Sequence, residues 1–155
     1  MTSFIGKIKD WKDPAPEKRE RGASAVEFAL ILPVLLLILF GIIEFGILLF
    51  DKAMLTNASR EGARAGIVYD TPTRMTQDEI EEVVLNYCQA HLITFSDGST
   101  DPEVDTDPPD PENLTSGDSL TVTVNYQYDF LLLPNLNTDL ASGINLEATT
   151  TMRAE

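Results

Sequence analysis

Residues 28–50, FALILPVLLLILFGIIEFGILLF, form an apolar run of 23 residues in which Glu44 is the only charged side chain. In a helix each residue adds about 1.5 Å, so the run reaches about 35 Å and can cross a hydrocarbon core of about 30 Å. The core helix of a soluble domain would present polar residues at every third or fourth position, and this run is apolar all round. The stretch therefore predicts a transmembrane helix.

Charge is distributed unevenly on the two sides of this run. The first 22 residues carry six Lys or Arg, whereas residues 51–155 carry 19 Asp or Glu against five Lys or Arg. Because basic flanks stay in the cytoplasm, we expect residues 1–22 to be a cytoplasmic leader and the acidic part to lie outside the cytoplasm. So acidic a body would repel phosphates, which excludes nucleic acid as a partner. Cys88 is the only cysteine, so no intrachain disulfide can form.

A cleaved secretory signal is the obvious competitor for this span. Such a signal has a shorter apolar region, of about 7–15 residues, followed by a small-x-small cleavage site. The residues after the run, Asp51 to Leu55, offer no such site. The small residues Gly22, Ala23, Ser24 and Ala25 instead precede the run, on its predicted cytoplasmic side.

Two segments, RGASAVEFALILPVLLLILFGIIEFG (21–46) and TNASREGARAG (56–66), together resemble the TadE-like pseudopilins of tight-adherence (Tad or Flp) type IV pilus systems. The resemblance implies that a membrane prepilin peptidase cuts after Gly22, so that Ala23 becomes the first mature residue. Glu27 would then be the fifth mature residue, the position that is the hallmark of the class, and Phe28 follows it.

The resemblance also implies the setting of the protein. The expected partners are membrane lipid, the prepilin peptidase, other pilins or pseudopilins and the Tad secretion machinery. The expected location is a single pass through the bacterial inner membrane, with possible incorporation into a cell-surface pilus. No cofactor and no metal site are expected.

Glu27 carries the assembly hypothesis. A carboxylate in hydrocarbon costs several kcal/mol unless it is paired or protonated. Cleavage after Gly22 would create an α-amino group on Ala23, and Glu27 of one subunit could pair with that amine on a neighbour. The alternative is that Glu27 lies at the cytoplasmic end and extends to the headgroups. The processing site at the matching spacing favours pairing.

Further along the helix, Glu44 approaches the outer interface, where we expect it to extend to the headgroups; a contact with a partner subunit's helix is the alternative. Ala58, Gly62 and Gly66 recur at four-residue spacing and form a smooth stripe that another element could approach closely. Packing of this stripe on the chain's own domain is favoured over a dedicated helix–helix contact between subunits.

We expect an α+β fold: a transmembrane and stalk helix over residues 23–66, then a small extracytoplasmic head over residues 67–155. Thr76 and Glu79 form a capping box that predicts a helix over 76–93. Its apolar stripe comprises Ile80, Val83, Val84, Tyr87, Cys88, His91 and Leu92. Strict alternation predicts antiparallel strands over 120–130 and 144–152, with Leu120, Val122 and Val124 on the buried face. Ile67–Tyr69 is a weaker candidate for a third strand.

Residues 96–119 contain eight Asp or Glu, four Pro and no Lys or Arg, which predicts a loop. Asp101, Asp105, Asp107 and Asp110 could bind Ca²⁺, but they lack the ordered spacing of a calcium loop. Cys88 and His91 lie three residues apart and could suggest a nucleophile with its base. Their place on the apolar stripe, without an orienting third group, favours core residues instead.

Two functions therefore remain at this stage. The first is a structural protein, a minor pseudopilin that is processed after Gly22 and helps to initiate or support pilus assembly. The second is an unprocessed, signal-anchored binding protein whose head meets a partner outside the cytoplasm. An enzyme is not expected, since the chain has one His, one Cys and no glycine-rich phosphate loop.

Overall fold

The computed structural model describes residues 18–68, 73–94, 101–130 and 143–154 of the 155-residue chain. The chain consists of two compact units, residues 1–38 and residues 39–155. Helix α1 (Lys18–Ile67) begins in the first unit and ends in the second, which also holds helix α2 (Gln77–His91) and a three-stranded antiparallel sheet. The α+β fold expected from the sequence is confirmed.

The first unit exposes its apolar side chains. From Gly22 to Ile38 every side chain is exposed except Leu32, which is half-buried. Pro33 lies inside the helix, where membrane helices tolerate it. The helix from Gly22 to Ile67 is long and apolar enough to cross a membrane, and its most apolar window is not buried by the protein. Because a soluble core helix would be covered by its own domain, this exposure fits a single-pass membrane anchor.

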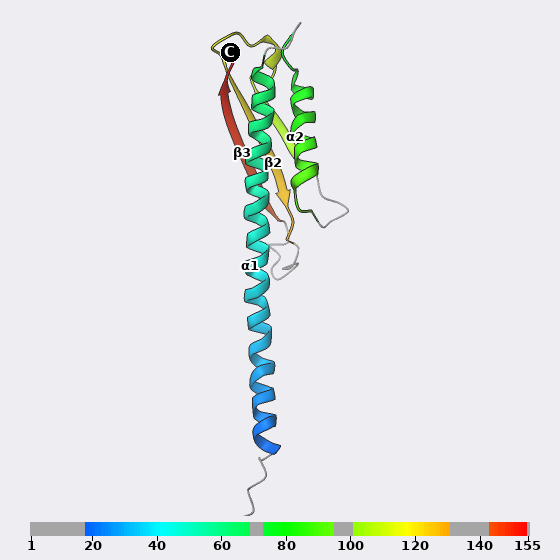
Figure 1. The fold of residues 1–155 in the computed structure, drawn as a ribbon, viewed down its shortest axis with the longest axis vertical. Coiled ribbons are helices and arrows are strands. Elements are labelled where there is room, and N and C mark those ends of the chain that lie inside the picture. Colours follow the sequence, from blue (N-terminus) through cyan, green and yellow to red (C-terminus); the bar gives the residue numbers. More distant parts are fainter. Residues whose placement is uncertain (1–17, 69–72, 95–100, 131–142, 155) are drawn as a thin grey trace, which may run out of the picture. The chain divides into compact units, whose positions relative to one another are not determined.

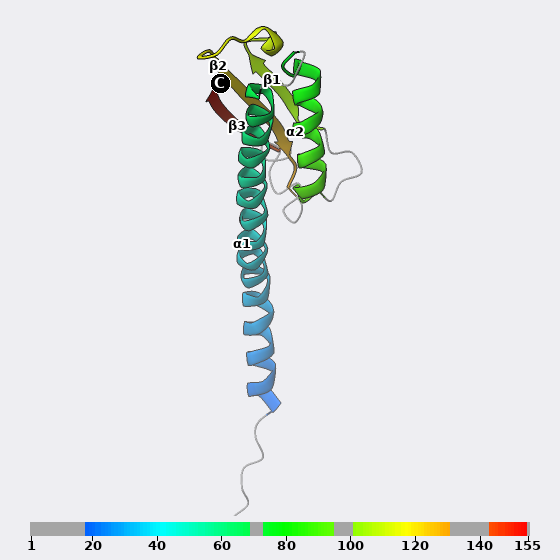
Figure 2. The ribbon, with the colours of Figure 1, turned by 45° about the horizontal axis from the view of Figure 1, so that its top comes forward.

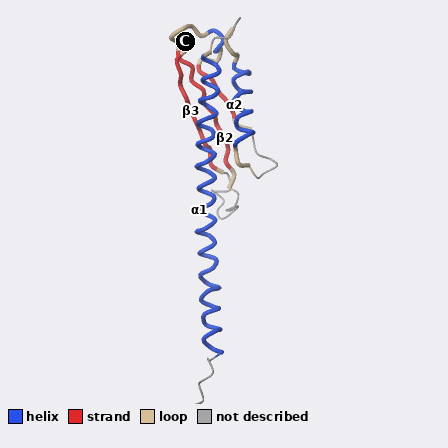
Figure 3. The backbone as a smooth tube through the Cα atoms, viewed as in Figure 1, coloured by secondary structure: helices blue, strands red, loops and turns tan. Residues whose placement is uncertain are grey.

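The sheet of the second unit, whose strands are red in Figure 3, contains β1 (Glu103–Asp107), β2 (Ser119–Tyr128) and β3 (Ile144–Arg153). Their order in the sheet is β1-β2-β3. Val124 on the central strand pairs with Val104 on one side and with Ala148 on the other. The predicted alternation of β2 is confirmed, because its even-numbered side chains from Leu120 to Tyr128 are all buried. β3 follows its predicted face except at Ile144, which is exposed.

Both helices cover the same face of this sheet. Figures 1 and 2 show α2 beside the C-terminal part of α1, with the strands behind them. The capping box of α2 is present, with Thr76 accepting from the Glu79 N–H and the Glu79 side chain accepting from the Thr76 N–H. The core comprises residues from all these elements: Leu55, Ala58, Ala63, Ile80, Val84, Cys88, Val104, Leu120, Val122, Val124, Tyr126, Tyr128, Leu146 and Ala148.

Two glycines allow α1 to approach its neighbours closely. A Cβ added at Gly62 would lie 2.5 Å from a methyl of Val84, and one at Gly66 would lie 2.5 Å from a methyl of Leu120. Ala58, one turn before Gly62, is fully buried. The stripe of small residues therefore packs on α2 and β2 of its own chain. Residues 51–66, expected to form a stalk, are a central part of the core.

Arg74 holds the end of α1. This buried guanidinium donates to the carbonyl of Ile67, the last residue of α1, and to the carbonyl of Leu114 at 3.1 Å. Helix ends leave carbonyls without partners, and a cation there also interacts favourably with the helix dipole. One side chain thus ties α1 to the segment that follows the short 3₁₀ helix η1 (Pro111–Asn113).

Three expectations are corrected here. The third strand is not Ile67–Tyr69, because α1 continues to Ile67, and Tyr69 lies outside the described residues. It is β1, which falls inside the segment 96–119 that was expected to be a loop; its Val104 and Thr106 face the core and its acids face outward. The second helix ends at His91 instead of residue 93, and His91 is exposed rather than part of the buried stripe.

Candidate functional site

The predicted processing motif lies on the exposed part of α1. Gly22, Ala23, Glu27 and Phe28 are all helical and exposed, and a Cβ added at Gly22 would meet no atom within 4 Å. Among the described residues, no side chain of the protein covers the Glu27 carboxylate. The described part of the chain therefore leaves Glu27 uncovered.

Glu44 has a different environment. Its side chain is only 2% exposed, and the Tyr128 hydroxyl donates to Glu44 Oε1 at 2.8 Å. Burial raises the pKa of Tyr128, and the bond to Glu44 raises it further, so that Tyr128 stays a donor over the usual pH range. The expectation that Glu44 extends to the headgroups is wrong: it binds a strand of its own chain, 84 residues away.

Asp51 lies two turns after Glu44 on the same flank of α1. It is fully buried, and its Oδ1 accepts the backbone N–H of Ile93 at 3.0 Å, just beyond the end of α2. Its Oδ2 has no hydrogen-bond partner among the described residues. Burial raises the pKa of the nearby Tyr126, and the charge of Asp51 adds to that effect. Glu44 and Asp51 thus attach α1 to β2 and to the end of α2, respectively.

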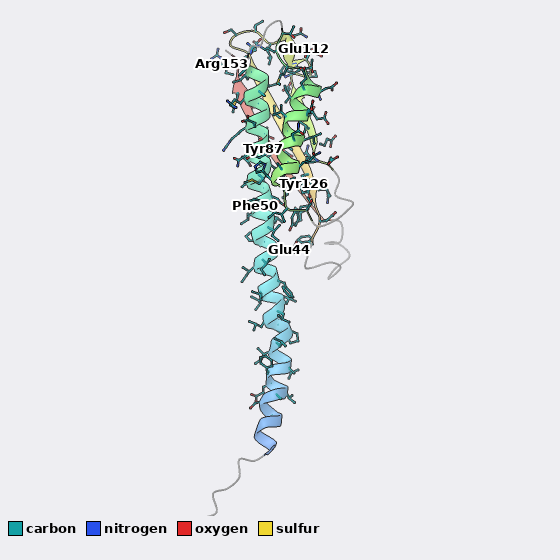
Figure 4. All side chains as sticks on the ribbon, turned by 45° about the vertical axis from the view of Figure 1, so that its right-hand side comes forward. Glu44, Phe50, Tyr87, Glu112, Tyr126 and Arg153 are labelled. Carbon is teal, nitrogen blue, oxygen red and sulfur yellow. The ribbon has the colours of Figure 1, made fainter. Side chains whose placement is uncertain are left out.

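Sequence reasoning missed this pair, although a signal was present. Counting along α1, Glu44 and Asp51 fall at the helical spacing of the fully buried Leu55 and Ala58 and of Gly62. One stripe therefore continues from the glycines through the two acids, and it marks the flank that packs on the sheet. Figure 4 shows Glu44 and Tyr126 toward one end of the second unit, with Glu112 and Arg153 toward the opposite end.

The Cys88–His91 pair does not form a catalytic dyad. Cys88 is buried beside a small hollow of about 160 Å³ that Leu92 and Tyr126 also line, and burial raises the pKa of its thiol to about 11. A thiol with that pKa is protonated at neutral pH and is a poor nucleophile. His91 stacks on Tyr87 with ring centroids 4.2 Å apart, and its Nδ1 lies 2.8 Å from the Tyr87 carbonyl oxygen.

The acidic residues of 101–118 are held by the sheet and by turns. Asp105 and Asp107 lie on the outward face of β1, and Asp118 accepts from the N–H and hydroxyl of Thr115. These hydrogen bonds lower the pKa of Asp118. In the described part of the chain, no group of three or more acidic, His or Cys side chains could hold a metal ion.

Together these features define an α+β protein whose described residues include one exposed apolar helix, of the kind that anchors a protein in a membrane by a single pass. The family model described as TadE-like protein matches residues 22–64, and the resemblance seen in the sequence is thereby confirmed over that segment. The match covers 43 of the 155 residues, so the similarity to TadE-like proteins is a property of this segment. No curated protein and no solved structure matches the chain significantly.

Proposed function

We propose that this protein is a minor pseudopilin of a Tad or Flp-type pilus, processed after Gly22 by a prepilin peptidase and acting in pilus assembly. The observation that carries the proposal is the family match, which begins at Gly22 and covers the whole apolar run of residues 28–50. Gly22 is also the residue after which the resemblance implies cleavage.

The two ends of α1 support different parts of this role. The exposed apolar residues from Val26 to Ile38 are suited to lipid and to the apolar helices of other subunits. The second unit is folded around the C-terminal part of α1 and presents an acidic, polar outer surface. A subunit of this kind is held by its helix and shows its folded part outside the cytoplasm, as the basic leader predicts.

Glu27 is proposed to select the register of assembly. An unpaired carboxylate within a membrane is unfavourable by several kcal/mol, and the new Ala23 amine of a neighbouring subunit offers a compensating charge. Since Glu27 is exposed on α1, such a neighbour could reach it. The partners in this step are the other pilins or pseudopilins and the Tad machinery.

Substitution of Glu27 tests this proposal. A Glu27→Gln chain should insert normally, because removing an intramembrane charge does not hinder insertion. It should fail to co-purify with other pilus components and should not support filaments, since an amide cannot compensate a buried amine. Glu61→Gln is the matched control, because it removes an exposed charge from the same helix outside the apolar run. Normal assembly by Glu27→Gln would refute the pairing mechanism.

A further inference from the structure

One end of the second unit exposes apolar side chains. We call it the Ile93–Ile144 end; there α2 and β2 end and β3 begins (Figure 1). Ile93 and Ile144 are 37% and 40% exposed, and the other exposed large apolar side chain outside α1 in the described residues is Val68. The Ile93 N–H donates to Asp51, and Ile144 pairs in register with Tyr128, which binds Glu44. Both isoleucines are therefore placed next to the Glu44–Asp51 segment of α1.

The same segment of α1 is apolar on the flank that the sheet leaves uncovered. Phe45, Leu49 and Phe50 are 61%, 51% and 41% exposed, whereas Glu44 and Asp51 are buried. Figure 4 shows Phe50 and Glu44 on this part of the helix. Over these two turns one flank of α1 therefore packs against the folded unit, and the other flank exposes large apolar side chains.

The length of the helix indicates what covers those side chains. From Gly22 to Glu44 there are 22 helical steps, about 33 Å, which matches a hydrocarbon core of about 30 Å. Large exposed apolar side chains recur from Phe28 to Phe50, and the one acid between them, Glu44, is buried. Residues 45–50 then fall at the boundary between acyl chains and headgroups. Two of them, Ile47 and Leu48, already pack on the core of the folded unit.

We propose that the Ile93–Ile144 end of the second unit rests in the outer lipid interface, so that the folded unit sits on the bilayer surface. The partner is the headgroup and upper acyl region of the membrane that holds α1. Exposed Asp129, the residue directly after β2 at this end, limits the depth, because a charged carboxylate stays in the headgroup layer. The inference rests on the membrane anchoring included in the proposed function, and it is independent of cleavage and of partner subunits.

Site-directed spin labels on the full-length chain in phosphatidylcholine vesicles test this contact. Four variants each receive one exposed cysteine: Ile93→Cys, Ile144→Cys, Val68→Cys and Leu35→Cys. Cys88 stays in place because its buried thiol is protected from the label, and the wild-type chain serves as the blank. For each label, collisions with dissolved oxygen, which concentrates in lipid, are compared with collisions with a water-soluble nickel complex.

Labels at 93 and 144 should show severalfold less nickel contact and more oxygen contact than the label at Val68, which lies at the opposite end. The label at Leu35 reports anchoring itself. If the label at Leu35 is protected from nickel while the labels at 93 and 144 behave like the label at Val68, the contact of the folded unit with lipid is refuted. The anchoring of α1 in the membrane is then still supported. If 93 and 144 are hidden from both collision partners, protein covers them and the lipid assignment is refuted. If Leu35 also contacts nickel, the anchoring fails.

Discussion

Helix α1 contains two segments that differ in how they pack, residues 22–43 and residues 44–67. The earlier segment is apolar all round and exposed, and Glu27 is its one charged side chain. The later segment places two acids, Leu55 and a stripe of small residues under a sheet. Apolar content does not separate them, because the apolar run continues to Phe50. What distinguishes the two segments is a flank of small and polar residues, which the later segment has. Only a flank that packs against protein needs such residues.

The largest effect is expected on the sheet that receives the later segment. Val124→Asp should destabilise the second unit by about 4 kcal/mol or more, because it buries an unpaired charge in a core position. Thr123→Asp, on the outward face of the same strand, should cost only about 1 kcal/mol, mainly because Asp105 lies opposite it in register on β1. Thermal unfolding of the full chain in detergent measures both. Equal losses would contradict the observed register.

The next largest effect is expected from substitution of a glycine, and it should differ between the two segments of α1. Gly62→Leu should cost about 3 kcal/mol, since its side chain would overlap Val84 and force the core apart. Gly41→Leu, which meets no atom within 4 Å, should be neutral or slightly stabilising because leucine favours helix over glycine. The same unfolding assay applies. A neutral Gly62→Leu would show that α1 does not pack closely on α2.

A smaller effect tests the attachment of Glu44. Tyr128→Phe removes the donor to a buried carboxyl and should cost about 1–3 kcal/mol. Tyr126→Phe is the control, because its hydroxyl has no hydrogen bond among those the structure describes. The pH dependence gives a second readout. The raised pKa of Tyr128 contributes stability that is present below pH 10.0, its ordinary value, and is lost as the pH rises toward the folded-state value.

Wild type should therefore lose more stability than Tyr128→Phe as the pH rises above that value. If the stability of the two chains falls equally as the pH rises, the Glu44–Tyr128 hydrogen bond does not stabilise the fold. The effect concerns only the later segment of α1, because Glu44, which accepts the Tyr128 hydrogen bond, lies in that segment.

Much of the second unit could be predicted from local pattern. The capping box and the spacing of Ile80, Val84 and Cys88 indicate α2, and strict alternation indicates β2 and β3. β1 could not be recognised, because its sequence Glu-Val-Asp-Thr-Asp has one apolar residue and an acidic composition typical of loops. It is tolerated as an edge strand, where outward charges are common.

The environment of Glu44 was beyond local pattern for a different reason. Its partner Tyr128 lies 84 residues away, and helical spacing alone does not say which strand a flank will meet. The motif at Gly22 and Glu27 shows the reverse. Under the proposed function it is readable in sequence because a peptidase and a neighbouring subunit would recognise a short linear segment, and the fold of this chain adds little to it.

N-terminal sequencing of the membrane-extracted protein tests the central claim, processing after Gly22, most directly. The wild-type chain should begin at Ala23, and a Gly22→Leu chain should keep its leader, because a bulky side chain no longer fits beside the scissile bond. A wild-type protein that retains residues 1–22, or a Gly22→Leu protein that still begins at Ala23, would contradict the account.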